Sequence, residues 1–296
     1  MRKLYCVADH IFSLECPEKW LSLLINYIPF EVADGEPIFT LTVSESPCPM
    51  RDETDDTLIF VDSSDDDMPR IEVYARSEYW RFAISKWKKS PICCQLCTDA
   101  LFTQATLYIS DSDARFAIDN GTMLLYAFRT AHLSTLELHA SAVVKDGFAQ
   151  LFLGHSGTGK STHARMWQAA YPDAWLLNDD NPVLRLMSDG QVRVYGSPWS
   201  GKTPCYKAQS APVRGIVKLS QAPQNQIHRL SHAEAYAYLL ASASGLKIVP
   251  KMMDELHATI AQVVMTVPFF GLQCLPDTFA AVLCHQTLST PDTTTL

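Results

Sequence analysis

The sequence contains no long apolar run and no pattern of an export signal. None of its hydrophobic stretches reaches the roughly 18 residues that are needed to span a bilayer. Arg2 and Lys3 supply charge near the N-terminus, but no long apolar segment follows them as it does in a secretory signal peptide. We therefore expect a cytoplasmic protein that does not bind a membrane.

Positive charge is also scarce. The 24 Lys and Arg residues are outnumbered by 32 Asp and Glu residues, which gives a formal net charge of −8, and no stripe of basic residues overrides this balance. Proteins that bind nucleic acids use such a stripe to neutralise phosphates. We therefore expect no nucleic-acid partner.

Cysteines are present, but without the pattern of a disulfide framework or a metal site. Their number, nine, is odd, and Cys94-x-x-Cys97 is the only pair with metal-like spacing. No second pair of Cys or His residues completes the four ligands of a zinc site. We expect reduced thiols, and a zinc or redox role for this pair is the less favoured alternative.

What the sequence does contain is a complete phosphate-binding loop, Gly154-His155-Ser156-Gly157-Thr158-Gly159-Lys160-Ser161. An apolar run of strand length precedes it, and a helical pattern follows it. In such loops, backbone N–H groups and the helix N-terminus face phosphate oxygens, the Lys neutralises the β/γ-phosphates, and the Ser hydroxyl reaches Mg²⁺. The pattern predicts ATP and Mg²⁺ as cofactors. The expected nucleotide contacts are Gly154, Ser156, Gly157, Thr158, Gly159, Lys160, Ser161 and Thr162.

Two carboxylates end a nearby apolar strand, Leu176-Leu177-Asn178-Asp179-Asp180. Acidic groups beside a phosphate loop can hold Mg²⁺ or accept a proton from an attacking hydroxyl. We therefore expect Ser161, Asp179 and Asp180 to be the metal ligands, with a simple Asp-Asp-Asn-Pro turn as the alternative. His139 lies on the strand before the loop hairpin, although a lone His is more often structural.

The pattern of elements predicts a mixed α+β protein with two domains. Residues 1–128 form a β-rich N-terminal domain, residues 129–288 a phosphate-loop domain, and residues 289–296 a disordered tail. A short helix is expected over Glu18–Ile28, and a connecting helix, capped by Asn120, over Thr122–His132. The expected strands of the first part are Ile38–Val43, Thr57–Val61, Ile71–Tyr74 and Ala105–Ile109. A hairpin through Lys145-Asp146-Gly147 is expected to lead into the phosphate loop, and a capping box at Ser231–Glu234 to open a later helix.

His139-Ala140-Ser141, the phosphate loop and Asn178-Asp179-Asp180 together resemble the catalytic domain of HPr kinase/phosphorylase, whose fold is similar to that of ATP-dependent phosphoenolpyruvate carboxykinase. The likeness covers about residues 130 to 285. It is closer to related kinases with a different N-terminal domain, through Gly196–Gly201, Val213-Arg214-Gly215-Ile216 and Leu272–Asp277.

The resemblance implies roles for individual residues. It implies that Asp179 is the general base toward a serine hydroxyl, with His139 nearby. It also implies that Arg214 contacts phosphate, in addition to Lys160 of the loop. Two positions depart from the family: Thr162 and Pro212 stand where HPr kinase has Glu. HPr as the substrate and a phosphorylase back-reaction are therefore left open.

The sequence supports two main readings. In the first, the chain is an ATP-dependent kinase that phosphorylates a hydroxyl, Ser of a protein or peptide, and the β-rich domain recognises this acceptor. In the second, it is a nucleotide-gated binding or regulatory module with little turnover. Carboxykinase chemistry would need an oxaloacetate pocket with several basic groups, which the sequence does not identify. The oligomeric state is left open, a homo-oligomer included.

Overall fold

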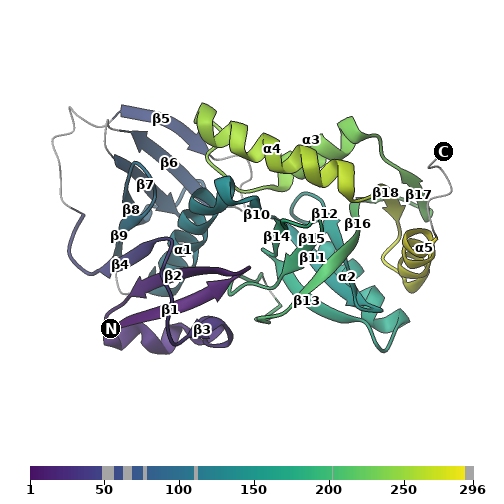
Figure 1. Ribbon diagram of the computed structural model, residues 1–296, viewed down its shortest axis with the longest axis horizontal. Helices are drawn as coiled ribbons and strands as arrows, with labels where there is room; N and C mark the ends of the chain where they lie inside the picture. Colours follow the sequence, from purple (N-terminus) through teal and green to yellow (C-terminus); the bar gives the residue numbers. More distant parts are fainter. Residues whose placement is uncertain (49–56, 63–68, 76–78, 110–112, 202, 291–296) are drawn as a thin grey trace. The chain divides into compact units, whose positions relative to one another are not determined.

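The computed structural model describes residues 1–48, 57–62, 69–75, 79–109, 113–201 and 203–290. The chain forms two compact units, Met1–Thr130 and Ala131–Leu296 (Figure 1). Each unit is built on a large mixed sheet with helices, so the prediction of a mixed α+β protein is confirmed. The predicted tail begins within the last helix, which ends at Ser289, and residues 291–296 lie outside the described part.

The first unit contains a nine-stranded sheet. The strand order is β3 (Glu31–Val32), β1 (Arg2–Val7), β2 (His10–Glu15), β4 (Thr40–Ser44), β9 (Gln104–Ile109), β8 (Ile92–Asp99), β7 (Tyr79–Ser85), β6 (Arg70–Ala75) and β5 (Thr57–Asp62). β4 runs parallel to β2 and to β9, and the other neighbours are antiparallel. All four strands predicted for this part are present.

The helices of the first unit differ from the prediction. Two 3₁₀ helices, η1 (Glu18–Leu23) and η2 (Ile25–Phe30), replace the single short helix. Helix α1 (Ala114–Thr130) packs on β9 and starts well before the expected position, so Asn120 lies inside it and donates from Nδ2 to the Phe116 carbonyl at 2.8 Å instead of capping it. Gly121 allows this helix to approach the sheet, because a Cβ there would lie 3.0 Å from Leu107 Cδ1.

The sheet of the second unit has the order β10 (Thr135–Glu137), β14 (Val183–Leu186), β15 (Val192–Tyr195), β16 (Ser210–Gln221), β12 (Phe148–Leu153), β11 (Ala140–Lys145) and β13 (Trp175–Asp180). β18 (Phe269–Cys274) pairs with β16 in parallel and with β17 (Gln226–Arg229). The predicted hairpin of β11 and β12 is confirmed, and its turn residues Asp146 and Gly147 both have positive φ.

Helices cover both faces of this sheet. α2 (Lys160–Ala170) and α5 (Thr278–Ser289) share one apolar core with side chains such as Phe152 and Val143. α3 (His232–Ser242) and α4 (Pro250–Thr266) share another core on the opposite face, with Leu151 and Ala142, and η4 (Ala131–Leu133) opens the unit. Alternate residues of β11 and β12 enter the two cores, as strand geometry requires. The predicted capping box starts α3.

No helix within the described residues combines the length and apolarity that a bilayer crossing needs.

Candidate functional site

Strand register brings the predicted loop, histidine and carboxylates to one edge of the second sheet. Leu153, the last residue of β12, pairs with Ala140 of β11, and Ala140 pairs on its other side with Asp180 of β13. His139 and Gly154, the next residues of their chains beyond these pairs, therefore lie at the same edge as Asp180. Residues far apart in the sequence thus meet where the phosphate loop leaves the sheet.

The backbone of the phosphate loop requires glycine at two positions, and it leads into the uncapped N-terminus of α2 (Lys160–Ala170). Gly157 and Gly159 have φ values of 77° and 104°, which side chains other than hydrogen disfavour. Gly159 precedes α2 and no side chain caps the helix. The first N–H groups of a helix have no partner within it, so an uncapped N-terminus suits a phosphate group. Ser156 and Gly157 are exposed, and Ser161 and Thr162 are half-buried in the first turn.

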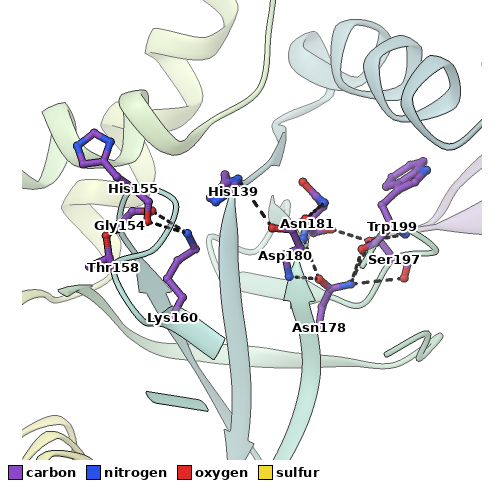
Figure 2. Close-up of polar contacts among 10 residues, drawn as sticks. All are labelled: His139, Gly154, His155, Thr158, Lys160, Asn178, Asp180, Asn181, Ser197 and Trp199. Carbon is purple, nitrogen blue, oxygen red and sulfur yellow. Dashed lines mark hydrogen bonds and ion pairs between the residues drawn. The ribbon is translucent and has the colours of Figure 1, made fainter. Parts of the chain in front are cut away.

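The side chain of Lys160, the first residue of α2, points back toward the start of the phosphate loop (Figure 2). Its Nζ donates hydrogen bonds to the carbonyl oxygens of Gly154 at 2.8 Å and His155 at 3.3 Å. Burial lowers the pKa of Lys160, and the negative charges of Asp180 and Asp179 oppose this shift. The ammonium group is therefore bound to the loop, within the electrostatic influence of both carboxylates.

Helix α2 is fixed to the sheet by a buried histidine that is not part of the site. His163 Nε2 accepts a hydrogen bond from Trp167 Nε1 at 3.1 Å, and its ring lies edge-on against Phe152 with the centroids 4.6 Å apart. Burial lowers the pKa of His163 to about 4, so the ring is neutral near pH 7. These contacts set the position of the helix N-terminus relative to β12.

The two carboxylates project from opposite faces of β13. Asp179 pairs with Ser141, which shares the face of β11 that α2 covers, whereas Asp180 pairs with Ala140 on the other face. Asp179 Oδ1 and Ser141 Oγ are buried and make no hydrogen bond within the described part of the chain. A buried carboxylate oxygen without a partner is costly unless a ligand completes it.

Asp180 is the carboxylate that His139 faces. The distance from His139 Nδ1 to Asp180 Oδ1 is 3.9 Å (Figure 2). Burial raises the pKa of the Asp180 carboxyl, and the charges of His139 and Lys160 oppose that shift. The histidine implied by the resemblance therefore faces the second carboxylate of the pair, Asp180.

Asn178 holds this strand end in place. Its fully buried amide donates from Nδ2 to the Trp199 carbonyl at 3.0 Å and to Ser197 Oγ at 3.1 Å. Its Oδ1 accepts from the backbone N–H groups of Asp180 at 3.0 Å and Asn181 at 2.9 Å (Figure 2). One side chain therefore joins the carboxylates to a neighbouring loop. The sequence motif included Asn178, but nothing in it indicated this structural role.

Glu137 is a further buried carboxyl group near the site. It is 1% exposed, and burial raises its pKa to about 8, with a further contribution from the negative charge of Asp180. Ser244 and Lys247 oppose the shift. The alternation Leu136-Glu137-Leu138 is typical of a half-exposed strand, so no local pattern predicts this burial.

Arg214 does not lie at the loop. It is near the start of β16, between the positions that pair with Ala149 and Gln150 at the far end of β12. Its guanidinium stacks on Phe148 and donates to Ser289 Oγ at 3.2 Å. Strand geometry puts Arg214 roughly 13 Å along β16 from the loop edge, so the structure does not bring it together with the phosphate loop, and its phosphate contact stays a prediction.

Lys218, four positions further along β16, is the basic residue that the register brings to the loop edge. It pairs with Leu153, directly before the phosphate loop. Burial lowers the pKa of Lys218, and its charge contributes to the lowered pKa of Lys160. The resemblance implies Arg214 as the phosphate contact, and only the parallel register of β12 and β16 shows that Lys218 lies closer to the loop.

The residues at the edge fit Mg²⁺ that arrives with a nucleotide. No group of three or more His, Cys, Asp or Glu side chains within the described ranges is arranged to hold a metal ion. Mg²⁺, however, is commonly bound by one or two carboxylates together with phosphate oxygens and water. The unpartnered Oδ1 of Asp179 is a ligand of that kind.

Comparison with known proteins assigns a family to the chain. No curated protein is significantly similar to it. A model of the family described as SynChlorMet cassette protein ScmC matches residues 110–277, more than half of the chain, and this stretch includes the phosphate loop, both carboxylates and β16. The chain therefore belongs to the ScmC family.

Proposed function

We propose that this protein is an ATP-dependent phosphotransferase that moves the γ-phosphoryl group to a hydroxyl, Ser of a protein or peptide. We also propose that its second unit has the fold of the phosphoenolpyruvate carboxykinase-like kinases. The observation that carries the proposal is the buried Asp179 Oδ1, which makes no hydrogen bond among the described residues and projects toward the face that α2 covers. A carboxylate at that position has no evident structural use and suits catalysis or metal binding.

The residues divide the chemistry between them. The amides of the loop and the N-terminus of α2 bind the phosphates, and Lys160 offsets the charge that develops during transfer. Ser161 together with either Asp179 or Asp180 would hold Mg²⁺, since the two carboxylates project from opposite faces of β13, and the ion would neutralise charge on the β- and γ-phosphates. Asp179 orients the acceptor hydroxyl and accepts its proton. His139 supports Asp180 through the contact at 3.9 Å.

Asp179→Asn tests this proposal. The amide cannot accept a proton, so we expect transfer to an acceptor to fall roughly 100- to 10,000-fold while ATP binding is retained. The assay is mass spectrometry of a cell extract incubated with the protein and labelled ATP. The matched control is Asp254→Asn, which removes an exposed carboxylate from α4 and should leave transfer unchanged. Full transfer by Asp179→Asn would exclude this residue as the base.

The nucleotide-gated binding module is the second candidate. It is favoured by the distance of Arg214 from the loop, since one expected phosphate contact is then missing. If the wild-type protein binds ATP but shows neither ATP turnover nor transfer to any acceptor in the extract, this reading replaces the first.

We further propose that the unit Met1–Thr130 selects the acceptor, because the phosphate loop, His139 and both carboxylates all belong to the unit Ala131–Leu296. Residues 131–296 expressed alone should then bind ATP but phosphorylate the acceptor poorly. A cooperative melt of the fragment must be shown first, because a misfolded fragment would give the same loss. Full activity of a folded fragment would show that the first unit does not select the acceptor.

A further inference from the structure

Four cysteines of the first unit gather around strands β8 and β4. Cys93, Cys94 and Cys97 lie on β8, and Cys48 lies shortly after the end of β4. Cys93 and Cys97 share one face of the strand and are half-buried, whereas Cys94 is buried on the other face. The Cys94-x-x-Cys97 pair therefore points to two sides of the sheet and cannot close on one metal ion.

A different pair of sulfurs is close together. Cys48 Sγ and Cys97 Sγ are 3.9 Å apart. Ser44, the last residue of β4, is level with Tyr108 of β9 and with Gln95 of β8, which precedes Cys97 by two positions. Cys48 lies four residues beyond Ser44 and contacts Cys97, although 48 other residues separate the two cysteines in the sequence.

A hollow adjoins this pair of cysteines. Its volume is about 300 Å³, and Cys48, Cys93, Glu45 and Tyr108 are among the residues that line it. Burial raises the pKa of Cys16 to about 11, whereas a hydrogen bond with Cys94 lowers the pKa of Cys93. A thiol with a lowered pKa carries more of the reactive thiolate at neutral pH, so Cys93 is the competing thiol that an experiment must distinguish.

We propose that Cys48 and Cys97 form a reversible disulfide when the protein meets a peroxide. The thiolate of one cysteine attacks a peroxide oxygen, the O–O bond breaks, and a sulfenic acid and hydroxide form. The thiol of the other cysteine then attacks that sulfur and water leaves, so that two thiols and one hydrogen peroxide give one disulfide and two waters. The sulfurs approach from 3.9 Å to the bond length of about 2.05 Å, and the bond links the segment after β4 to β8.

Peptide mapping of the full-length chain tests this directly. The reduced protein is freed of reductant, treated with a small excess of hydrogen peroxide, alkylated and digested with trypsin. Cleavage after Lys19, Arg51, Lys89 and Arg115 yields residues 20–51, whose only cysteine is Cys48, and residues 90–115, which hold Cys93, Cys94 and Cys97. We expect these two peptides to be cross-linked with the loss of two hydrogen atoms, and dithiothreitol to separate them.

Two variants identify the partner within the second peptide. Cys97→Ser should abolish the cross-link, whereas Cys93→Ser, a half-exposed cysteine on the same face of β8, should retain it. Unchanged thermal melts of the reduced variants show that both are folded. The proposal is overturned if the wild type forms no cross-link, if it forms only sulfinic or sulfonic acids, or if the cross-link persists in Cys97→Ser and is lost in Cys93→Ser.

Discussion

Removing the loop lysine should reduce the stabilisation of this protein by ATP to about a third. Lys160→Ala deletes the cation beside the loop and the carboxylates, and with it the hydrogen bonds to the carbonyl oxygens of Gly154 and His155. The loss that matters for ATP is the hydrogen bond that the lysine would donate to a phosphate oxygen. A hydrogen bond between charged groups contributes about 1.5–3 kcal/mol, so ATP affinity should fall between roughly 10- and 150-fold.

The size of the thermal shift follows from this loss. At an ATP concentration of about 100 times Kd, binding stabilises the wild type by about 2.7 kcal/mol, and a 30-fold weaker Kd leaves about 0.9 kcal/mol. For a unit of this size, each kcal/mol changes Tm by about 2–4 °C. We therefore expect a shift of about 5–11 °C in the wild type and about 2–3 °C in Lys160→Ala.

The assay is a pair of thermal melts for each variant, with and without ATP and Mg²⁺. The difference between the two melts is compared, because Lys160→Ala also loses loop contacts in the absence of ATP. Lys251→Ala, an exposed lysine of α4, is the control and should shift like the wild type. An equal shift in Lys160→Ala would refute the placement of ATP at this loop.

Three further predictions concern groups around the site. Since the pKa of Glu137 is raised from 4.5 to about 8 in the fold, its contribution to stability is present at low pH and is lost as the pH rises through this window. Glu137→Gln should therefore flatten the decline in urea-unfolding free energy between about pH 5 and 8 by roughly 3–5 kcal/mol, and an unchanged slope would contradict the burial of this carboxyl. Asn178→Ala leaves several buried groups unpaired and should lower the unfolding free energy in urea by roughly 2–4 kcal/mol; a loss below 1 kcal/mol would be inconsistent with its four contacts. By calorimetry, Lys218→Ala should weaken ATP binding roughly tenfold, whereas Arg214→Ala should leave it unchanged; the reverse result would return the phosphate contact to the arginine.

The sequence predicted those parts of the fold whose signals are local. The phosphate loop, the hairpin before it and the capping box at Ser231 depend on residues a few positions apart, and all three have the expected backbone. The first hairpin, β1–β2, was missed because its turn residues Ala8 and Asp9 both adopt positive φ without the glycine that usually marks such a turn. Asn120 is typical of a helix cap, but it lies inside α1 because that helix already begins at Ala114.

The parts of the site that could not be predicted depend on strand register. The positions of Arg214 and Lys218 relative to the loop follow from the parallel pairing of β12 with β16, which no local pattern encodes. Cys97 is a similar case, because its close partner is Cys48 in the segment after β4 and not the Cys94 of its own motif. Motifs therefore predict the chemistry of the loop, and only the sheet shows which residues are its neighbours.

The parallel pairing of β12 with β16 and of β16 with β18 also determines when the site can form during synthesis. A ribosome releases the chain from its N-terminus, so β11, β12 and the phosphate loop emerge well before β16. Until β16 arrives, one backbone edge of β12 is unpaired, and the side chains of Leu151, Phe152 and Leu153, which are fully buried in the folded protein, lack part of their cover. Pairings between distant segments are slow to form, and an exposed strand edge invites aggregation. A nascent chain should therefore acquire ATP binding only after β16 has been released, and chaperone contacts should concentrate on β12 before that point.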